Sequence, residues 1–331
     1  MKVSQKIAAL SLAGVVGTIA LAGCSTTPAA STYRASSSSN SHITIGFVPG
    51  ETTDPFFISM EYGAKQEAAK LGVKLDWEGA SQYEPSLQTP VVNSEVARKV
   101  SALIIAPTDA KAMIPPIKNA VKAGIPVITV DSTITQLSLL KSRVTSNNIQ
   151  GGEAAAQILA KLIGDKGMVA VLSPDPGIST DAARYQGFKE EIAKYPNIKF
   201  VGIQYDQEQN TTAATDAQDL ILHYPNLSGI FGTDDTSASG AAVGVKSAGK
   251  VGPVKIVGYD AEPAEVQDVQ TGAISALIAQ KPMVEGELAV KYAVDAAKHL
   301  HNFPKFTQLH NIVIDKDNLK ANQQWVYRST P

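Results

Sequence analysis

Carboxylates stand where the sequence pattern predicts three strand tips and one helix start, and two aromatic residues follow the first of them. The six residues are Asp54, Phe56, Phe57, Asp131, Asp234 and Asp260. Carboxylates accept paired hydrogen bonds, and flat rings pack against C–H bonds, so this combination suits a compact molecule with hydroxyls at its edge and apolar faces. The residues therefore predict a binding site for a sugar or polyol.

Sequence patterns typical of catalysis are absent. The chain has no G-x-S-x-G, P-loop or G-x-G-x-x-G motif. Its five histidines are scattered, and His299 and His301, two apart on a predicted helix, do not face one another. We therefore expect no metal, no cofactor and no enzymatic activity. The alternative that stays open is glycoside hydrolysis, with clustered carboxylates as acid and nucleophile.

The N-terminus has the pattern of an export signal. Lys2 and Lys6 precede an apolar run at 7–22, which is shorter than the ~20 residues of a membrane-spanning helix. The run ends in LAGC, which resembles the lipobox of bacterial lipoproteins, and Cys24 is the only cysteine. We expect a signal peptide at 1–23 and a lipidated Ser/Thr-rich tether at 24–42. The alternative is an ordinary signal peptide with a chance cysteine.

The rest of the chain alternates short β-branched runs with helical patterns, which indicates the α/β class. Predicted strands cover 43–48, 73–77, 102–106, 126–130, 168–172, 198–204, 229–232, 255–258, 274–279 and 311–314. Several are apolar without alternation, as strands covered by helices on both faces must be. Between the first two strands, Asp54 and Pro55 supply a helix cap and first turn, and Gly72 ends the helix.

A net charge of −2 argues against a nucleic-acid surface.

A partial internal repeat gives the strongest architectural signal. LIIAPTDAKA leads through a helix to AGIPVITVDS, and IFGTDDTSASGAA leads to AGKVGPVKIVGYDA. Each copy reads strand, loop, helix, strand, aspartate. Open parallel sheets bind ligands beyond the carboxyl ends of their strands. Two such lobes facing each other would place Asp131 and Asp260 on opposite walls of one crevice.

In these segments the chain resembles the periplasmic ribose-binding type of solute-binding protein, which serves ABC transporters. The resemblance rests on DPFFISMEYGAKQEAAKLG, IIAPTDA, PVITVD, the Arg184…Gly187-Phe188 element, IVGYDAEP and IAQKP, in this order. It implies two flavodoxin-like, doubly wound parallel-sheet lobes joined by a three-segment hinge near Ser146, Gln280 and Leu309. The N-lobe would comprise 43–146 plus 281–308, and the C-lobe 147–280 plus 309–331. A ligand would be trapped when the lobes close.

The resemblance also implies the ligand-binding residues. They are Asp54, Phe56, Phe57, Asp131, Arg184, Asp234, Asp260 and Gln280. Asp131 and Asp260 would accept hydrogen bonds from vicinal hydroxyls of the ligand, and the phenylalanines would stack on its apolar faces. Arg184 would be the main hydrogen-bond donor, and Gln280 would lie on one of the segments that cross between the lobes. This chain departs from the family pattern at three positions: Ser132 stands where ribose binders have arginine, and Ala106 and Asp234 stand where they have asparagine. Where the family could offer a second aromatic ring, beside 206–209, the only aromatic residue is Tyr205. This makes ribose doubtful and favours donor-rich ligands such as an acyclic polyol, an amino or deoxy sugar, or a pentose held differently.

Several of these residues have a structural alternative. Asp54 can serve only as a helix cap, Asp131 and Asp260 can cap the helices that follow them, and only one of the two phenylalanines need face the cleft. Arg184 can pair with a helix acid such as Glu190 or Glu191, and Asp235 can replace Asp234.

Two functional alternatives share this fold. Lactose-repressor-type regulators carry a DNA-binding segment where this chain has a signal sequence, so DNA binding is excluded. A sensory receptor for a sugar-like signal in chemotaxis or quorum sensing would use the same pocket, and the sequence does not separate sensing from transport. We expect a monomeric, extracytoplasmic lipoprotein on the cell membrane that meets an ABC permease.

The anchor is testable with Cys24→Ala. Removing the thiol should release the protein from membranes without changing ligand affinity, because the lipid would be its only attachment. Membrane fractionation with immunoblotting measures this. Continued membrane retention of the variant would refute the lipid anchor.

Overall fold

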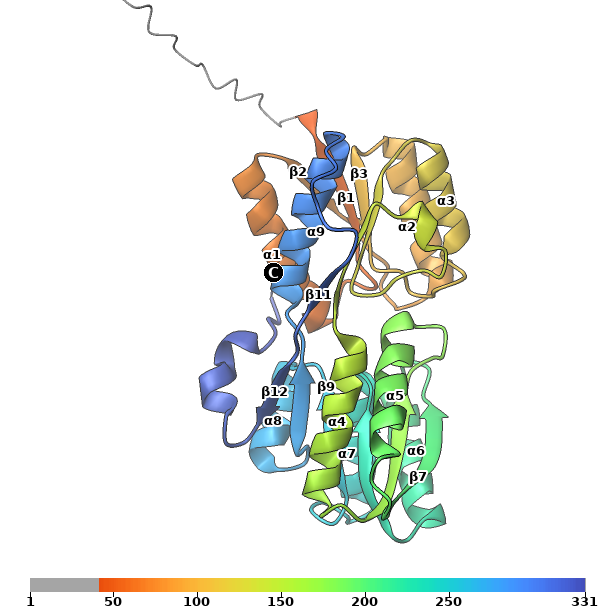
Figure 1. Ribbon diagram of the computed structural model, residues 1–331, viewed down its shortest axis with the longest axis vertical. Coiled ribbons are helices and arrows are strands. Elements are labelled where there is room, and N and C mark those ends of the chain that lie inside the picture. Colours follow the sequence, from red (N-terminus) through yellow and green to blue (C-terminus); the bar gives the residue numbers. More distant parts are fainter. Residues whose placement is uncertain (1–41, 331) are drawn as a thin grey trace, which may run out of the picture. The chain divides into compact units, whose positions relative to one another are not determined.

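The computed structural model describes residues 42–330, which form two six-stranded sheets (Figure 1). The strands of the first sheet are β1 (Thr44–Val48), β2 (Lys74–Trp77), β3 (Ala102–Ile105), β4 (Val127–Val130), β5 (Ser142–Ser146) and β11 (Thr307–Leu309). Those of the second are β6 (Gly167–Ser173), β7 (Ile198–Tyr205), β8 (Leu227–Gly232), β9 (Lys255–Tyr259), β10 (Ala276–Ala279) and β12 (Ile312–Asp315). Strand orders are β11-β5-β4-β3-β1-β2 and β12-β10-β9-β8-β6-β7. The predicted α/β class with two doubly wound lobes is confirmed.

Helices flank both sheets. Around the first lie α1 (Pro55–Leu71), α2 (Pro85–Arg98), α3 (Ile114–Lys122), α9 (Pro282–Ala297) and the 3-10 helix η2 (Leu137–Leu139). Around the second lie α4 (Asn148–Leu162), α5 (Ser179–Ile192), α6 (Asn210–His223), α7 (Asp235–Ser247), α8 (Pro263–Thr271) and the 3-10 helix η3 (Leu319–Trp325). We call the half built on the first sheet the N-lobe and the other half the C-lobe. No helix among residues 42–330 is long and apolar enough to cross a membrane.

The central strands explain why the sequence pattern could locate them. Every residue of β3 and β4 is buried, because α1 and α9 pack together beside this sheet and α2 packs against α3. All ten predicted strands are present, with ends shifted by up to two residues. Sequence analysis missed β5 and β11. The first has the polar sequence SRVTS, and the second is a three-residue strand at the sheet edge, so neither carries a continuous apolar run.

The chain changes lobe at the three places that the resemblance implied: after β5, after β10, and between β11 and β12. Hydrogen bonds tie two of these crossings together. The Asn147 N–H donates to Leu309 O (2.8 Å), and Asn311 Nδ2 donates to Asn147 O (2.9 Å). Beside them, Ser146 Oγ donates to the buried carboxylate of Glu285 on α9 (2.7 Å).

The lobes also touch directly beside the crevice. Ala110 N donates to Gly177 O (3.0 Å), and Thr133 N donates to Ser179 Oγ (2.8 Å). In each pair the donor belongs to the N-lobe and the acceptor to the C-lobe. The structure therefore represents the closed arrangement of the two lobes.

Close contact between α4 and α5 fixes the position of Arg184. A β-carbon added at Gly152 would collide with the backbone carbonyl of Arg184, and one added at Gly187 would collide with that of Ile149. The two glycines thus let the helix backbones meet without intervening side chains. Arg184, in the middle of α5, is held at a set distance from α4 and from the hinge that leads into it.

We expect Gly152→Ala to lower the free energy of unfolding by about 1–3 kcal/mol, because a methyl group forces these packed backbones apart. Ligand affinity should fall as well, since α5 carries Arg184. Chemical denaturation and calorimetry measure the two effects. Lys161→Ala, an exposed change on the same helix, is the control. Unchanged stability of the glycine variant would contradict the packing argument.

Candidate functional site

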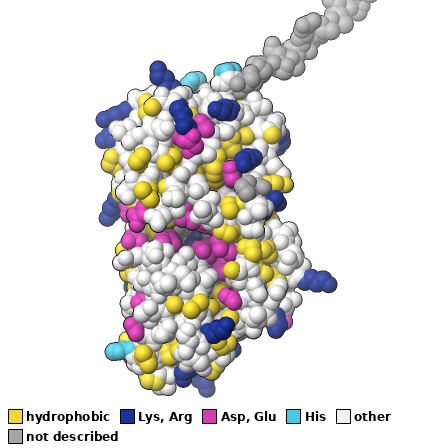
Figure 2. All heavy atoms as spheres, turned by 180° about the vertical axis from the view of Figure 1, so that it is seen from behind, with side chains coloured by type: hydrophobic (Ala, Val, Ile, Leu, Met, Phe, Trp, Pro, Cys, Tyr) yellow, Lys and Arg dark blue, Asp and Glu magenta, His cyan; other side chains and the backbone are white. Residues whose placement is uncertain are grey.

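A cavity of about 330 Å³ lies in the crevice, lined from both lobes. All eight sequence-predicted binding residues line it. Among the described residues, the lining has nine carboxylate residues and one basic residue, Arg184. The carboxylates are Glu51, Asp54, Asp131, Asp181, Glu208, Asp234, Asp235, Asp260 and Glu262. In Figure 2 the Asp and Glu side chains gather along the gap between the two halves of the described chain. This concentration of negative charge is the site's main electrostatic feature.

Asp131 and Asp260 occupy equivalent positions in the two lobes. Asp131 directly follows β4, and Asp260 directly follows β9. Both have left-handed backbone conformations, with φ of 59° and 79°. Aspartate is among the few residues other than glycine that visit this region readily. The shared conformation supports the internal repeat and turns both side chains toward the same cavity from opposite lobes.

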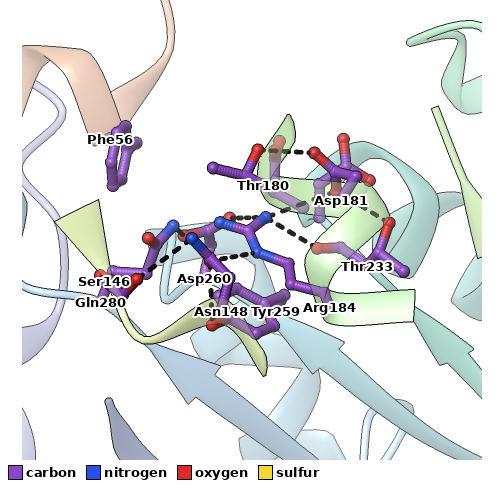
Figure 3. A network of polar contacts seen from close by, with 12 residues as sticks. Phe56, Ser146, Asn148, Thr180, Asp181, Arg184, Thr233, Tyr259, Asp260 and Gln280 are labelled. Atoms are coloured by element: carbon purple, nitrogen blue, oxygen red, sulfur yellow. Dashed lines mark hydrogen bonds and ion pairs between the residues drawn. The ribbon is translucent and has the colours of Figure 1, made fainter. Parts of the chain in front are cut away.

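Arg184 forms the centre of a buried polar network on the C-lobe side (Figure 3). Its Nε donates to Asn148 Oδ1 (3.0 Å), and its Nη1 donates to Thr233 O (2.8 Å). The guanidinium also stacks 3.8 Å above the ring of Tyr259. These contacts fix the guanidinium group at the cavity wall. Its Nη2 makes no hydrogen bond to the described residues.

The charge partners of Arg184 are carboxylates of the cavity. Its Nη1 lies 3.5 Å from Asp181 Oδ1 and 3.9 Å from Asp260 Oδ2. Burial alone would disfavour the guanidinium charge, but these neighbours outweigh it and raise the pKa of Arg184. The alternative pairing with Glu190 or Glu191 is wrong, since those residues contact Gln186 and Lys194.

The hydrogen bonds around Gln280 orient its amide. Its Nε2 donates to Asp260 Oδ1 (2.7 Å), which leaves Oε1 buried with no hydrogen-bond partner among residues 42–330. Asp131 Oδ1 is likewise buried and has no partner in this part of the chain. Buried acceptors without donors are costly. Two lobes therefore present unsatisfied acceptors to one cavity, which is what a ligand rich in hydroxyl or amino hydrogens requires.

Aromatic rings cover the N-lobe wall. Phe56 and Phe57 both line the cavity and meet edge to face, with ring centroids 5.1 Å apart. Tyr83 stacks against Phe57 and also lines the cavity. Sequence analysis missed Tyr83, which lies in the loop before α2 and carries no motif. Tyr205 is 39% exposed at the end of β7 and is absent from the lining.

Three of the helices that begin at the cavity have an acidic cap. Asp54 accepts from Phe56 N at the start of α1 (2.6 Å), and Asp234 accepts from Ser237 N at the start of α7 (2.9 Å). Glu262 forms a capping box at the start of α8. Asp54 is therefore both a cap and a lining residue. Positive helix ends partly offset the concentrated negative charge.

Two of the acids that sequence analysis missed had recognisable signals. Asp181 lies one helical turn before Arg184, and Glu262 precedes the proline that opens α8. Asp235, which sequence analysis offered only as a replacement for Asp234, lines the cavity together with it. The replacements at Ala106 and Ser132 lie outside the cavity lining: Ala106 is fully buried, and Ser132 Oγ donates to Pro107 O (2.7 Å).

Burial and mutual repulsion keep protons on several of these carboxyls. Desolvation raises the pKa of Asp131 and of Asp234 to about 7. Desolvation and the charge of Asp235 raise the pKa of Glu262 to about 8. One oxygen each from Asp54, Asp235 and Glu262 lies within 4.8 Å of the others, which brings acids of both lobes together. Ionisation of these carboxyls at high pH therefore brings like charges together in the closed cleft.

Comparisons place this site within a family. Residues 45–300 match the family described as the periplasmic binding protein domain. This chain belongs to that family. The ribose import binding protein of Bacillus subtilis (strain 168) is 31% identical over 275 residues, which cover 83% of this chain and 88% of that protein.

Two solved structures resemble this periplasmic binding protein closely. An ABC transporter solute binding protein from Agrobacterium vitis, bound with alpha-D-tagatopyranose, is 37% identical with a TM-score of 0.84, over 86% of this chain and 99% of that one. An ABC transporter periplasmic solute binding protein from Actinobacillus succinogenes 130z, with bound D-allose, is 30% identical and has a TM-score of 0.77. The match covers 84% of this chain and 99% of that one. The chain is accordingly a solute-binding protein and not an enzyme, which removes the glycosidase alternative.

The raised carboxyl pKa values predict how stability depends on pH. Between about pH 5 and pH 8 the folded, ligand-free protein retains protons on Asp131, Asp234 and Glu262 that the unfolded chain releases. The free energy of unfolding should therefore fall as pH rises through this window, with a loss of at least about 3 °C in melting temperature. Differential scanning calorimetry measures it.

Glu262→Gln should flatten this dependence above pH 6, because it removes the group with the highest of these three values. Glu190→Gln, an exposed carboxyl on α5, serves as the control. A melting temperature that rises between pH 5 and pH 8 would contradict the assignment of protonated carboxyls.

Proposed function

We propose that this periplasmic binding protein captures a small polyhydroxylated ligand, a sugar or polyol, between its lobes and delivers it to an ABC importer. One observation carries the proposal: two buried acceptors, Asp131 Oδ1 and Gln280 Oε1, have no donor among the described residues, and the two residues line the same cavity from opposite lobes. A ligand with several hydroxyl hydrogens satisfies both at once. The sugars named for the relatives support the same class.

Each proposed contact follows from the side chain's chemistry. Asp131 and Asp260 accept from adjacent hydroxyls, Arg184 donates through Nη2, and Phe56 and Phe57 pack against the C–H faces. Asp54 and Asp234 add acceptors beside two helix starts. The ligand is neutral or cationic, because an added carboxylate or phosphate would meet nine acidic residues and a single arginine.

Transport requires that the ligand favour the closed form over the open one. It does so by contacting residues of both lobes, since only differential affinity shifts the population of two states. The direct hydrogen bonds between the lobes, such as Ala110 N to Gly177 O, form at the same time. The closed surface is then the form that the membrane permease recognises.

The cellular setting is part of the proposal. We infer a lipoprotein anchored through Cys24 on the outer side of the cell membrane, acting as a monomer. Residues 1–41 lie outside the described residues, so this rests on the signal-like sequence and the LAGC motif. A relative is named a D-allose-binding periplasmic protein, which supports a location outside the cytoplasm.

A thermal-shift screen tests the function. Pentoses, hexoses, polyols and amino sugars form the test set, and sugar phosphates and uronic acids form the negative set. A true ligand raises the melting temperature with the logarithm of its excess over the dissociation constant. Failure of every compound in the test set, or binding confined to the anionic set, would overturn the proposal.

Asp131→Ala and Asp260→Ala should each weaken binding of the identified ligand by roughly 2 kcal/mol or more, about 30-fold, because each leaves a hydrogen-bond donor of the ligand without its acceptor in a closed site. Isothermal titration calorimetry measures the change. Asp219→Ala, an exposed substitution on α6, should leave affinity unchanged. Losses below about threefold in both cavity variants would exclude these residues from the binding site.

A further inference from the structure

The end of the described chain returns from the C-lobe to the N-lobe. After β12 and η3, Tyr327 N donates to Ala261 O in the C-lobe (3.0 Å), and the next residue, Arg328, donates from its backbone N to Ser59 Oγ on α1 (2.7 Å). The Arg328 guanidinium also lies 3.9 Å from the ring centroid of Tyr62 on α1. Figure 1 shows this C-terminal segment running from the second half of the molecule to α1. We call residues 326–328 the C-terminal clasp.

The buried hydroxyl of Tyr327 connects the clasp to Gln280 and Asp260, two residues that line the cavity. Gln280 N donates to this oxygen (2.9 Å), so the single hydroxyl proton is free to point at Asp260 Oδ1, 2.8 Å away. Oδ1 therefore receives two donors, from Tyr327 and from Gln280 Nε2. Burial raises the pKa of Asp260, and both donors oppose this effect because hydrogen bonds to an ionised carboxylate are stronger than those to a neutral carboxyl. They leave Oδ2, which lies toward Arg184, as the remaining acceptor.

The same residue packs against the aromatic wall. The rings of Tyr327 and Phe56 meet at 5.7 Å and 63°, and only 5% of the Tyr327 surface is exposed. Tyr327 is not part of the cavity lining. It can therefore act on the ligand only through Asp260, Gln280 and Phe56, which do line the cavity.

The two ends of the clasp are fixed to different lobes, beyond the three chain crossings. Ala261 and Asp260 belong to the C-lobe, and Ser59 and Tyr62 to the N-lobe. An opening motion that moves Ser59 away from Ala261 breaks one set of these contacts. Contacts made only in the closed arrangement stabilise that arrangement without any ligand.

We propose that the C-terminal clasp is a positioning and closure element: Tyr327 fixes Asp260 as an ionised acceptor for the ligand, and Arg328 with Ser59 biases the lobes toward closure. The first half rests on the proposed sugar or polyol capture, whereas the second concerns the ligand-free protein alone. Two variants separate these halves.

Tyr327→Phe tests the positioning role, because it keeps the ring and removes only the hydroxyl. We expect affinity for the ligand found in the screen to fall about tenfold or more, as for a lost hydrogen bond to a charged group. The loss should be greater at pH 6 than at pH 8, since a carboxylate with one donor fewer has a higher pKa and is protonated earlier as pH falls.

The pH comparison is made against the parent protein, because other charged or ionisable side chains lie near Asp260. They are Asp54, Asp131, Asp181, Arg184, Asp235, Tyr259, Glu262, Glu265 and Glu285. All of them are unchanged in the variant, so the difference between the two profiles reports on Asp260. Affinity within threefold of the parent at both pH values, or an equal loss at both, would overturn the positioning role.

The double variant Ser59→Ala, Arg328→Ala tests closure and changes no residue of the cavity lining. Small-angle X-ray scattering of the ligand-free protein should show a larger radius of gyration than the parent, and saturating ligand should restore the parent value. Lys320→Ala, an exposed change on η3, is the control. Equal radii for the ligand-free parent and double variant would overturn the closure role, even if the parent binds none of the screened sugars.

Discussion

The structure depends on one electrostatic constraint: within residues 42–330, nine carboxylate residues and a single guanidinium face one closed cavity. Such a set is tolerable only because each acid has a local compensation. Asp54, Asp234 and Glu262 cap helix starts, Asp181 and Asp260 lie beside Arg184, and burial raises the pKa of the remaining four carboxyls. A ligand rich in hydrogen-bond donors would satisfy the acceptors that remain unpaired. Because these acceptors belong to both lobes, ligand binding would stabilise the closed arrangement.

Much of this arrangement could be predicted from the sequence because its signals are local. Apolar strands such as β3 and β4 are continuous, helix starts carry caps, and the two repeats end in Asp131 and Asp260. The eight binding residues implied by the family resemblance all reach the cavity. The polar strand β5 and the edge strand β11 left no such signal. Their place in the sheet is set by pairing with β4 and by the hinge, which are tertiary effects.

The roles of residues on loops and outside the recognised segments also depend on tertiary contacts, so the sequence did not predict them. Tyr83 joins the aromatic wall through stacking on Phe57, and Tyr327 reaches Asp260 from 67 positions away. Neither lies in a motif, and only the folded chain brings them to the cleft. The resemblance implied which residues bind, whereas the hydrogen-bond directions that set Gln280 and Asp260 as acceptors required coordinates.

The left-handed backbone at Asp131 and Asp260 limits how such a protein can acquire a new ligand. With φ of 59° and 79°, these positions admit few residues without strain, so a change there alters the turn as well as the contact. Loop residues of the lining, such as Glu51 and Tyr83, carry no comparable restriction. Divergence in substrate preference should therefore concentrate at these loop positions, with the two aspartates as a fixed anchor around which different ligands are selected.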